Sequence, residues 1–111
     1  MTFRRADVVT VALHGDLGKP RPSIVIQADW VVGPETLLVV LLTSNLSDAP
    51  LYRYDLEPSV TNGLRKRSQV QIDKIVPIPL HRIGGKIGRI GTEQMIEIDR
   101  LLAAMIGLVG A

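Results

Sequence analysis

The chain has 111 residues, of which 46% are hydrophobic, so it is long enough for one domain with a modest core and too short for two. Because it contains no cysteine, disulfide frameworks, cysteine nucleophiles and thiolate metal sites are excluded. The formal net charge is only +2, but residues 63–89 hold seven lysines and arginines against one acid, Asp73. Such a segregated basic segment is typical of a solvated face or of a surface that binds a phosphate-rich partner.

Signals for export, membrane insertion or metal binding are missing from the sequence. The first residues carry two arginines, but no apolar run of signal-peptide length and no cleavage pattern follow them. The longest apolar stretches, such as residues 37–42, are far below membrane-spanning length. Two isolated histidines, His14 and His81, lack the spacing of a zinc site. We therefore expect a cytoplasmic protein with no cofactor and no membrane contact.

Two short strands open the chain. Residues 7–13 alternate enough to predict a strand, and residues 23–27 predict a second one. Between them lies Arg21, which stands between two prolines. Because proline fixes its own backbone and pushes the preceding residue to extended geometry, we expect Arg21 to be held stiffly at the mouth of the second strand. That stiffness lowers the entropy lost when Arg21 binds an anion.

The middle of the chain predicts a buried strand followed by an exposed one. Residues 36–43, TLLVVLLT, are almost wholly apolar, which indicates a central strand buried on both faces. This strand ends at the polar residues Thr43, Ser44 and Asn45. Residues 51–56 alternate and predict a short edge strand, and the sequence Thr-Asn-Gly at 61–63 predicts a tight turn.

The basic segment predicts a further strand after Leu64. Val70 and Ile72 share one face there, while Gln69 and Gln71 share the other. We expect the prolines at 77 and 79 to end regular pairing. The glycines that follow Ile83 predict a connection leading to a short strand at 86–90.

A helix is predicted at the end of the chain. Thr92 is its expected N-cap and Gly110 its expected stop. After Leu101 the helix is apolar nearly all round, so we expect it to pack against the sheet or against a second copy of the chain. Short strands with glycine and proline turns, together with one terminal helix, predict a small curved sheet or barrel.

Taken in this order, the elements resemble the MazF/PemK family of toxin endoribonucleases, which are encoded beside an antitoxin. No single motif is specific, and the colinear set carries the resemblance. The set comprises ADVVTVAL at 6–13, RPSIVIQAD at 21–29, the buried strand ending at Thr43 and Ser44, LRKRSQVQIDKIVPIP at 64–79, and the terminal helix. Two departures are Ala6, where the family usually has glycine, and the first loop, HGDLGKP, which is shorter than in many relatives.

The resemblance implies both a fold and an activity. The fold is mainly β, an SH3-like, partly open β-barrel with a C-terminal α-helix, in which residues 1–111 form a single domain that assembles as a homodimer. The activity is that of a toxin of a type II toxin–antitoxin system. It is metal-independent, sequence-specific cleavage of single-stranded RNA by attack of the ribose 2′-hydroxyl on the adjacent phosphate. The partners are the RNA and a cognate antitoxin, through which the complex binds DNA.

The resemblance also assigns residues to roles. Arg21 takes the place of the catalytic arginine and Thr43 that of the catalytic hydroxyl residue, while His14 matches a histidine of some relatives that is a candidate for proton transfer. Asp73 is either a general base or a structural ion-pair partner. The residues expected to bind RNA, through position in the family, basic charge or amide chemistry, are Ser44, Arg65, Lys66, Arg67, Ser68, Gln69 and Gln71.

Side-chain chemistry agrees with the two main roles. A preorganised guanidinium can bind two oxygens of the attacked phosphate as its charge grows, which lysine cannot do. A threonine hydroxyl can donate to another oxygen or orient the nucleophile. Two alternatives remain: a non-enzymatic gyrase poison like CcdB, which shares the fold, and a family member that binds RNA without cutting it. The ending GLVGA lacks the aromatic residue of the CcdB tail, which favours the ribonuclease.

Overall fold

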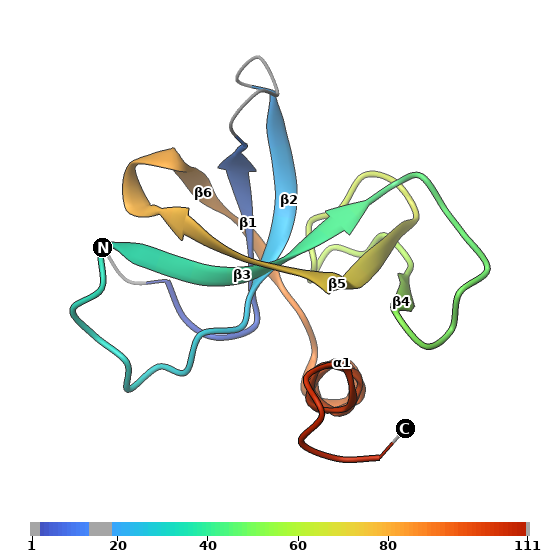
Figure 1. Ribbon diagram of the computed structural model, residues 1–111. Helices are drawn as coiled ribbons and strands as arrows, with labels where there is room; N and C mark the ends of the chain where they lie inside the picture. Colours follow the sequence, from blue (N-terminus) through green and yellow to red (C-terminus); the bar gives the residue numbers. More distant parts are fainter. Residues whose placement is uncertain (1–2, 14–18, 111) are drawn as a thin grey trace.

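In the computed structural model, which describes residues 3–13 and 19–110, these residues form one six-stranded antiparallel sheet and one α-helix (Figure 1). The order across the sheet is β4-β5-β3-β2-β1-β6, so the curled sheet is open between β4 and β6. The prediction of a mainly β fold with a C-terminal helix is confirmed. The elements are β1 (Asp7–Ala12), β2 (Pro20–Val25), β3 (Thr36–Thr43), β4 (Arg53–Leu56), β5 (Ser68–Pro79), the 3-10 turn η1 (Leu80–Arg82), β6 (Ile83–Arg89) and α1 (Thr92–Met105).

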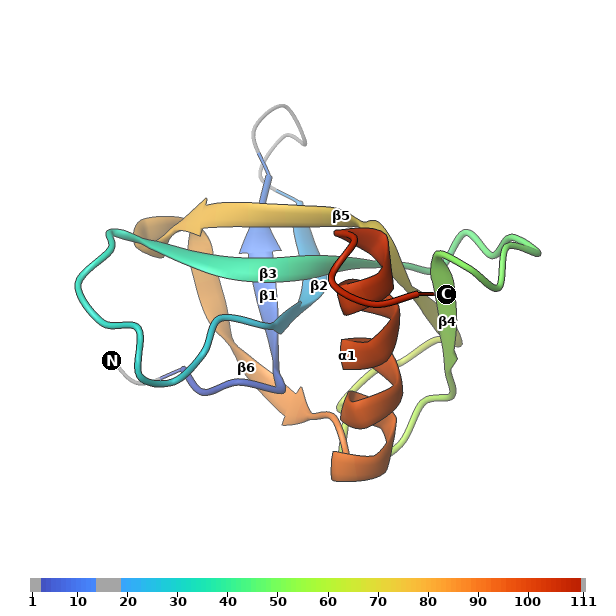
Figure 2. The same ribbon diagram turned by 60° about the horizontal axis from the view of Figure 1, so that its bottom comes forward.

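The sheet buries apolar side chains on both of its faces. Alternate residues of β3 enter two separate clusters, with Val40 and Leu42 in one and Leu37 and Val39 in the other. The helix α1 lies against the sheet beside β5 (Figure 2), and three of its side chains are buried in the first cluster, Met95, Ile98 and Leu102. The prediction that residues 36–43 form a central strand buried on both faces is therefore confirmed.

Pro77 and Pro79 do not stop regular pairing, so that prediction was wrong, and β5 runs to Pro79. Both remain in register with β3, opposite Leu38 and Thr36. Their nitrogens, two residues apart, face the same side of the strand, and the ladder with β3 continues through them. On the other side β4 pairs with β5 only over residues 68–71, so these prolines lie where β5 is an edge and no donor is needed.

β6 begins earlier than predicted, because Gly84 and Gly85 belong to the strand rather than to a connection. Gly85 is paired with Thr10 of β1, and Gly84 falls at one of the two register shifts in this ladder. A Cβ atom at Gly84 would lie 2.5 Å from the hydroxyl oxygen of Thr10. Glycine is thus used here to bring two strands close together, which its pattern in the sequence did not distinguish from a loop.

Both ends of α1 differ from the prediction. Gly91 is the N-cap, and Thr92 is the first helical residue, with no side-chain hydrogen bond at the cap. The helix ends at Met105 rather than near Gly110, because Gly107 adopts the left-handed conformation (φ 82°) and its N–H donates to the carbonyl of Ala104. Within residues 3–13 and 19–110, no helix has the length and apolar character that a membrane crossing requires.

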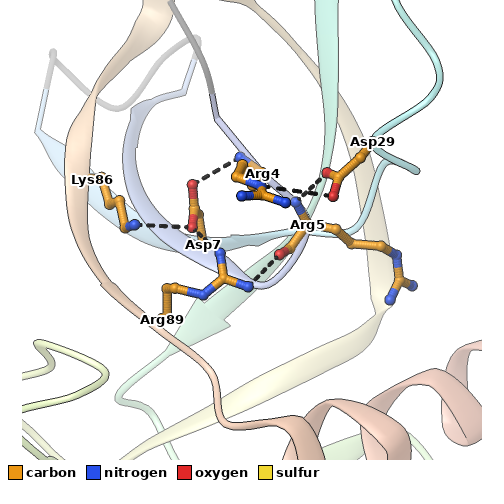
Figure 3. A network of polar contacts seen from close by, with 6 residues as sticks. All are labelled: Arg4, Arg5, Asp7, Asp29, Lys86 and Arg89. Carbon is orange, nitrogen blue, oxygen red and sulfur yellow. Dashed lines mark hydrogen bonds and ion pairs between the residues drawn. The ribbon is translucent and has the colours of Figure 1, made fainter.

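A buried carboxylate joins the N-terminal segment to β6 (Figure 3). Asp7 is 1% exposed, and its Oδ1 accepts a 2.6 Å hydrogen bond from Nη1 of Arg89 and lies 3.3 Å from Nζ of Lys86. Its Oδ2 accepts a 2.8 Å hydrogen bond from the backbone N–H of Arg4. The burial of this charge is offset because it has two cationic partners and a backbone donor.

Arg5 makes a second tie, between the N-terminal segment and the helix. Its guanidinium donates to both carboxylate oxygens of Asp99 on α1, at 2.9 and 2.7 Å, and its Nε donates to the carbonyl of Ile26. Its backbone N–H donates to Asp29 at 2.7 Å (Figure 3). The residues before β1 therefore fasten β6, α1 and the loop after β2 to one another.

We expect Asp7→Asn to lower the free energy of unfolding by about 2–3 kcal/mol, because it removes the charge that two cations and a backbone amide share inside the protein. Asp29→Asn is the matched control, since an exposed amide still accepts the hydrogen bond from Arg5 and should cost less than about 1 kcal/mol. Urea unfolding of the two variants measures both values. Equal losses would contradict the structural importance given to Asp7.

Candidate active site

A cavity of about 620 Å³ lies where β2 and β3 meet the segment that leads into β5. Arg21 and Thr43, two of the three predicted catalytic residues, both line it. Four of the residues predicted to bind RNA line the same cavity: Ser44, Arg65, Lys66 and Ser68. Residues predicted from three separate parts of the chain therefore meet at one site.

Strand register brings Arg21 and Thr43 together. Ser23 of β2 is paired with Leu41 of β3, and continuing this antiparallel register by two residues places Arg21 level with Thr43. Arg21 is also paired with Val11 of β1 and therefore lies within β2. The sequence had instead placed it at the mouth of the strand. The backbone of Arg21 is thus held by a strand partner as well as by the prolines.

Two hydroxyl groups of the site are oriented by the local backbone. The hydroxyl oxygen of Thr43 accepts a 3.0 Å hydrogen bond from the N–H of Asn45, so its proton is available to donate to a bound ligand. The hydroxyl of Ser68, in contrast, donates to the carbonyl of Lys66 at 2.9 Å and holds the turn before β5. Of the two, Thr43 is the one prepared to act as a donor in the cavity.

The charged groups of the cavity are all positive among its described lining residues, which include Lys19, Arg21, Arg65 and Lys66. A cleft lined by one sign of charge concentrates ligands of the opposite sign. Arg67 does not line the cavity, because its guanidinium lies 3.1 Å from Glu57 and 3.6 Å from Asp55. Of these three consecutive cations, Arg65 and Lys66 line the cavity and Arg67 belongs to an ion-pair cluster.

The two glutamines predicted to bind RNA do not line this cavity either. Gln69 is buried, and its amide is hydrogen-bonded to Ser47, Arg53 and Asp55. Gln71 is half-buried and is paired with Arg53 of β4. Both side chains lie farther along β5, beyond the lining residue Ser68.

The remaining candidates for proton transfer or metal binding are not placed in the cavity by the structure. His14 lies outside the described residues. Asp73 does not line the cavity, and a 2.7 Å hydrogen bond from Lys74 keeps the pKa of its carboxyl below its ordinary value. Within the described part of the chain, no group of three or more histidine, aspartate or glutamate side chains is arranged to hold a metal ion.

Sequence reasoning missed some residues of the site, among them Thr10, Lys19 and Ile87. Thr10 is the one polar side chain in the predicted first strand after Asp7, which was a signal that could have been used. Lys19 precedes the Pro-Arg-Pro sequence and shares its restricted backbone. Ile87 had no comparable signal, because its contact with the cavity depends on how β6 packs beside residues 61–64.

Comparison with known proteins places the chain in a family. Residues 4–106 match the family described as PemK-like, MazF-like toxin of type II toxin-antitoxin system. The chain belongs to this family. It is also 36% identical over 109 residues to the probable endoribonuclease MazF of Mycolicibacterium smegmatis, covering 97% of this chain and 100% of that protein. The MazF/PemK resemblance seen in the sequence is therefore confirmed, and the chain is a homologue of a probable endoribonuclease over the whole length of that protein.

Solved structures share the MazF-like fold. An endoribonuclease in complex with its cognate antitoxin, from a mycobacterial species, superposes with a TM-score of 0.82 at 20% identity, covering 99% of this chain and 100% of that one. The Mycobacterium tuberculosis toxin MazF-mt6 gives 0.76 at 19% identity, covering 90% and 95%. A MazE-MazF complex from Deinococcus radiodurans gives 0.78 at 15% identity, covering 96% and 97%. At these identities the likeness confirms the fold.

Proposed function

We propose that this chain, as a MazF-like toxin, cleaves single-stranded RNA at specific short motifs and needs no metal ion to do so. One observation carries the proposal: Arg21 and Thr43 line the same cavity, and the described charged residues around them are all cations. RNA is a polyanion, and cleavage of its backbone requires a fixed positive group at the reacting phosphate. The 36% identity to a probable endoribonuclease supports the same activity.

The proposed reaction is an internal transfer of the phosphate. The ribose 2′-oxygen attacks the adjacent phosphorus, the bond from phosphorus to the 5′-oxygen breaks, and the products are a 2′,3′-cyclic phosphate and a 5′-hydroxyl. The 2′-hydroxyl loses its proton and the leaving oxygen gains one. The guanidinium of Arg21 binds two non-bridging oxygens as negative charge grows on them, and Thr43 donates to a third acceptor or orients the nucleophile. His14 is a candidate for proton transfer.

The same cavity supplies the proposed contacts to the RNA. Ser44 lies beside Thr43, where it reaches the nucleotides that flank the cut, and the buried Ser68 holds the turn that carries Lys66. Arg65 and Lys66 are exposed and draw in the phosphate backbone. Arg67 and Gln71 lie outside the cavity, so we assign them to RNA beyond these nucleotides.

Partners other than RNA follow from the relatives. MazF-like structures have been solved with their cognate antitoxins, and we infer that this chain likewise binds an antitoxin, through which the complex binds DNA. We also propose that it forms a homodimer. The exposed apolar residues near the end of the chain, Ile96, Met105, Ile106, Leu108 and Val109, supply surface for such contacts.

Incubation of the purified protein with a long single-stranded RNA in the presence of EDTA tests the proposal. We expect discrete cuts at a shared short motif, with a cyclic phosphate at each new 3′ end and a hydroxyl at each new 5′ end. Cuts that disappear when EDTA is present would refute the metal-independent mechanism. An uncut RNA with a folded protein would favour a family member that only binds RNA, or a gyrase poison.

The basic residues of the cavity should set the salt dependence of RNA binding. We expect Lys66→Ala to weaken binding to RNA of any sequence and to reduce the slope of log K against log salt concentration by about 0.7, the value for one contact with a single strand. Lys74→Ala is the control, because Lys74 pairs with Asp73 and does not line the cavity. Titration of an RNA with 2′-deoxy nucleotides, which cannot be cut, provides the measurement. Equal slopes for the two variants would exclude Lys66 as a phosphate contact.

A further inference from the structure

We propose that Gln69 is a positioning residue of the active site, which fixes the loop after Thr43 in the geometry that RNA cleavage needs. This inference rests on the proposed ribonuclease function and replaces the direct contact with RNA that the sequence suggested for Gln69. The side chain is only 5% exposed and does not line the cavity. A residue in this place acts on the site through its neighbours.

All hydrogen-bonding positions of the Gln69 amide are occupied by protein groups. Its Oε1 accepts from the N–H of Ser47 at 2.9 Å and from Nη1 of Arg53 at 3.0 Å. Its Nε2 donates to the carbonyl of Ser47 at 2.8 Å and to Oδ1 of Asp55 at 2.8 Å. A glutamine amide offers two acceptor positions and two donors, so nothing is left to read a base. The amide pairs with Ser47 as a neighbouring strand would.

The Gln69 network is connected to Thr43 in two ways, through the strand ladder and through Asn45. Gln69 is paired with Thr43 in the ladder between β3 and β5. Arg53, which donates to Gln69, uses the same Nη1 to donate to the carbonyl of Asn45 at 3.1 Å. The N–H of Asn45 in turn donates to the hydroxyl oxygen of Thr43. Gln69 thus fixes residues 45–47 at two points, and the first of them orients the catalytic hydroxyl.

The loop needs such a tie because it is exposed. Residues 44–48 are all exposed and belong to neither β3 nor β4. Without Gln69, the backbone groups of Ser47 lose their side-chain partner and Arg53 keeps only its hydrogen bond to the carbonyl of Asn45, so the loop is free to move the donor at Thr43. A displacement of about 1 Å in a positioned group can slow a reaction by about a hundredfold.

Gln27 offers a matched control with the same chemistry in another place. Its Nε2 donates to the carbonyl of Val31 at 3.1 Å, and its Oε1 accepts from the N–H of Leu38 at 3.0 Å. It too uses its amide to fix a loop to the sheet, but it lines a different cavity, beside Arg4 and Asp29. Loss of Gln27 should destabilise the protein without affecting cleavage.

The decisive comparison is between Gln69→Leu and Gln27→Leu, assayed on an RNA that carries the cleavage motif. For Gln69→Leu we expect kcat to fall by about tenfold or more, KM to stay within about twofold, and the motif to be unchanged. The amide protons of Ser47 and Asn45 should exchange faster with solvent. For Gln27→Leu we expect kcat and these two amides to be unchanged.

A compensating pair tests the network directly and covers the case in which Gln69→Leu does not fold. In Gln69→Glu, one carboxylate oxygen faces the carbonyl of Ser47 and the carboxylate of Asp55, so kcat should fall. Adding Asp55→Asn supplies a donor to that oxygen and restores three of the four hydrogen bonds, so kcat should recover in part. Asp55→Asn alone keeps an acceptor for Gln69 and should change kcat little.

Three results would overturn the proposal. A changed motif or a raised KM at constant kcat in Gln69→Leu would make Gln69 a reader of RNA. An equal fall of kcat in Gln27→Leu would reduce the effect to general stability, and absence of recovery in the double variant would remove the network. If the wild-type protein cuts no RNA, the proposed function fails, and exchange of the Ser47 amide still decides whether Gln69 fixes the loop.

Discussion

Arg21→Ala is expected to slow RNA cleavage by about a thousandfold, and Arg21→Lys by about a hundredfold, with the fold intact in both. The size follows from the loss of a preorganised donor at the reacting phosphate, for which single removals cost about a hundredfold to a thousandfold. Lysine keeps the charge but loses the fork that binds two oxygens together. Because Arg21 is exposed, neither change should alter the free energy of unfolding by more than about 0.5 kcal/mol.

Single-turnover cleavage of an RNA with one motif, with the protein in excess, measures the chemical step in these variants. Arg4→Ala serves as the control for a lost surface charge, because the side chain of Arg4 is exposed and lies beside Asp29 and another cavity. Equal rates for Arg21→Lys and the wild type would mean that charge alone matters at this position. Full activity of Arg21→Ala would remove Arg21 from the mechanism.

The sequence was sufficient to predict Arg21, Thr43 and four RNA-binding residues of the cavity, but not how they meet. Arg21 and Thr43 were expected from the resemblance, and both line the site. Their position level with each other depends on the register between β2 and β3. No local pattern fixes this register, because residues 37–42 are all apolar. The uniformly apolar sequence made the strand itself predictable, but the same uniformity left its register undetermined.

The functional division among neighbouring residues was also beyond the sequence. Arg65, Lys66 and Arg67 are equivalent by composition, yet Arg67 is taken up by Asp55 and Glu57, which the pairing of β4 with β5 brings beside it. Gln69 alternates as a surface residue would, and it is buried because the loop at 44–48 folds back over it. Contacts between distant segments decide both outcomes, so periodicity could not reveal them.

Gly88→Ala is expected to lower the free energy of unfolding by about 3 kcal/mol or more, because a side chain there has no room. A Cβ atom at Gly88 would lie 2.3 Å from the backbone carbon of Asn62 and 2.5 Å from the carbonyl oxygen of Thr61. That carbonyl accepts a 2.8 Å hydrogen bond from the N–H of Arg89, so the turn rests directly on β6. Neither backbone can yield without breaking this bond.

Gly85→Ala is the matched control in the same strand, since a Cβ atom there meets nothing within 4 Å and should change stability by no more than about 0.5 kcal/mol. Urea unfolding of the two variants gives the difference. The turn continues through Gly63 into Arg65 and Lys66, and Ile87 lies on its other side, all in the wall of the cavity. Gly88→Ala should therefore also weaken RNA binding under conditions where the variant remains folded. Equal stability and equal RNA binding in the two variants would show that the turn does not depend on its contact with β6.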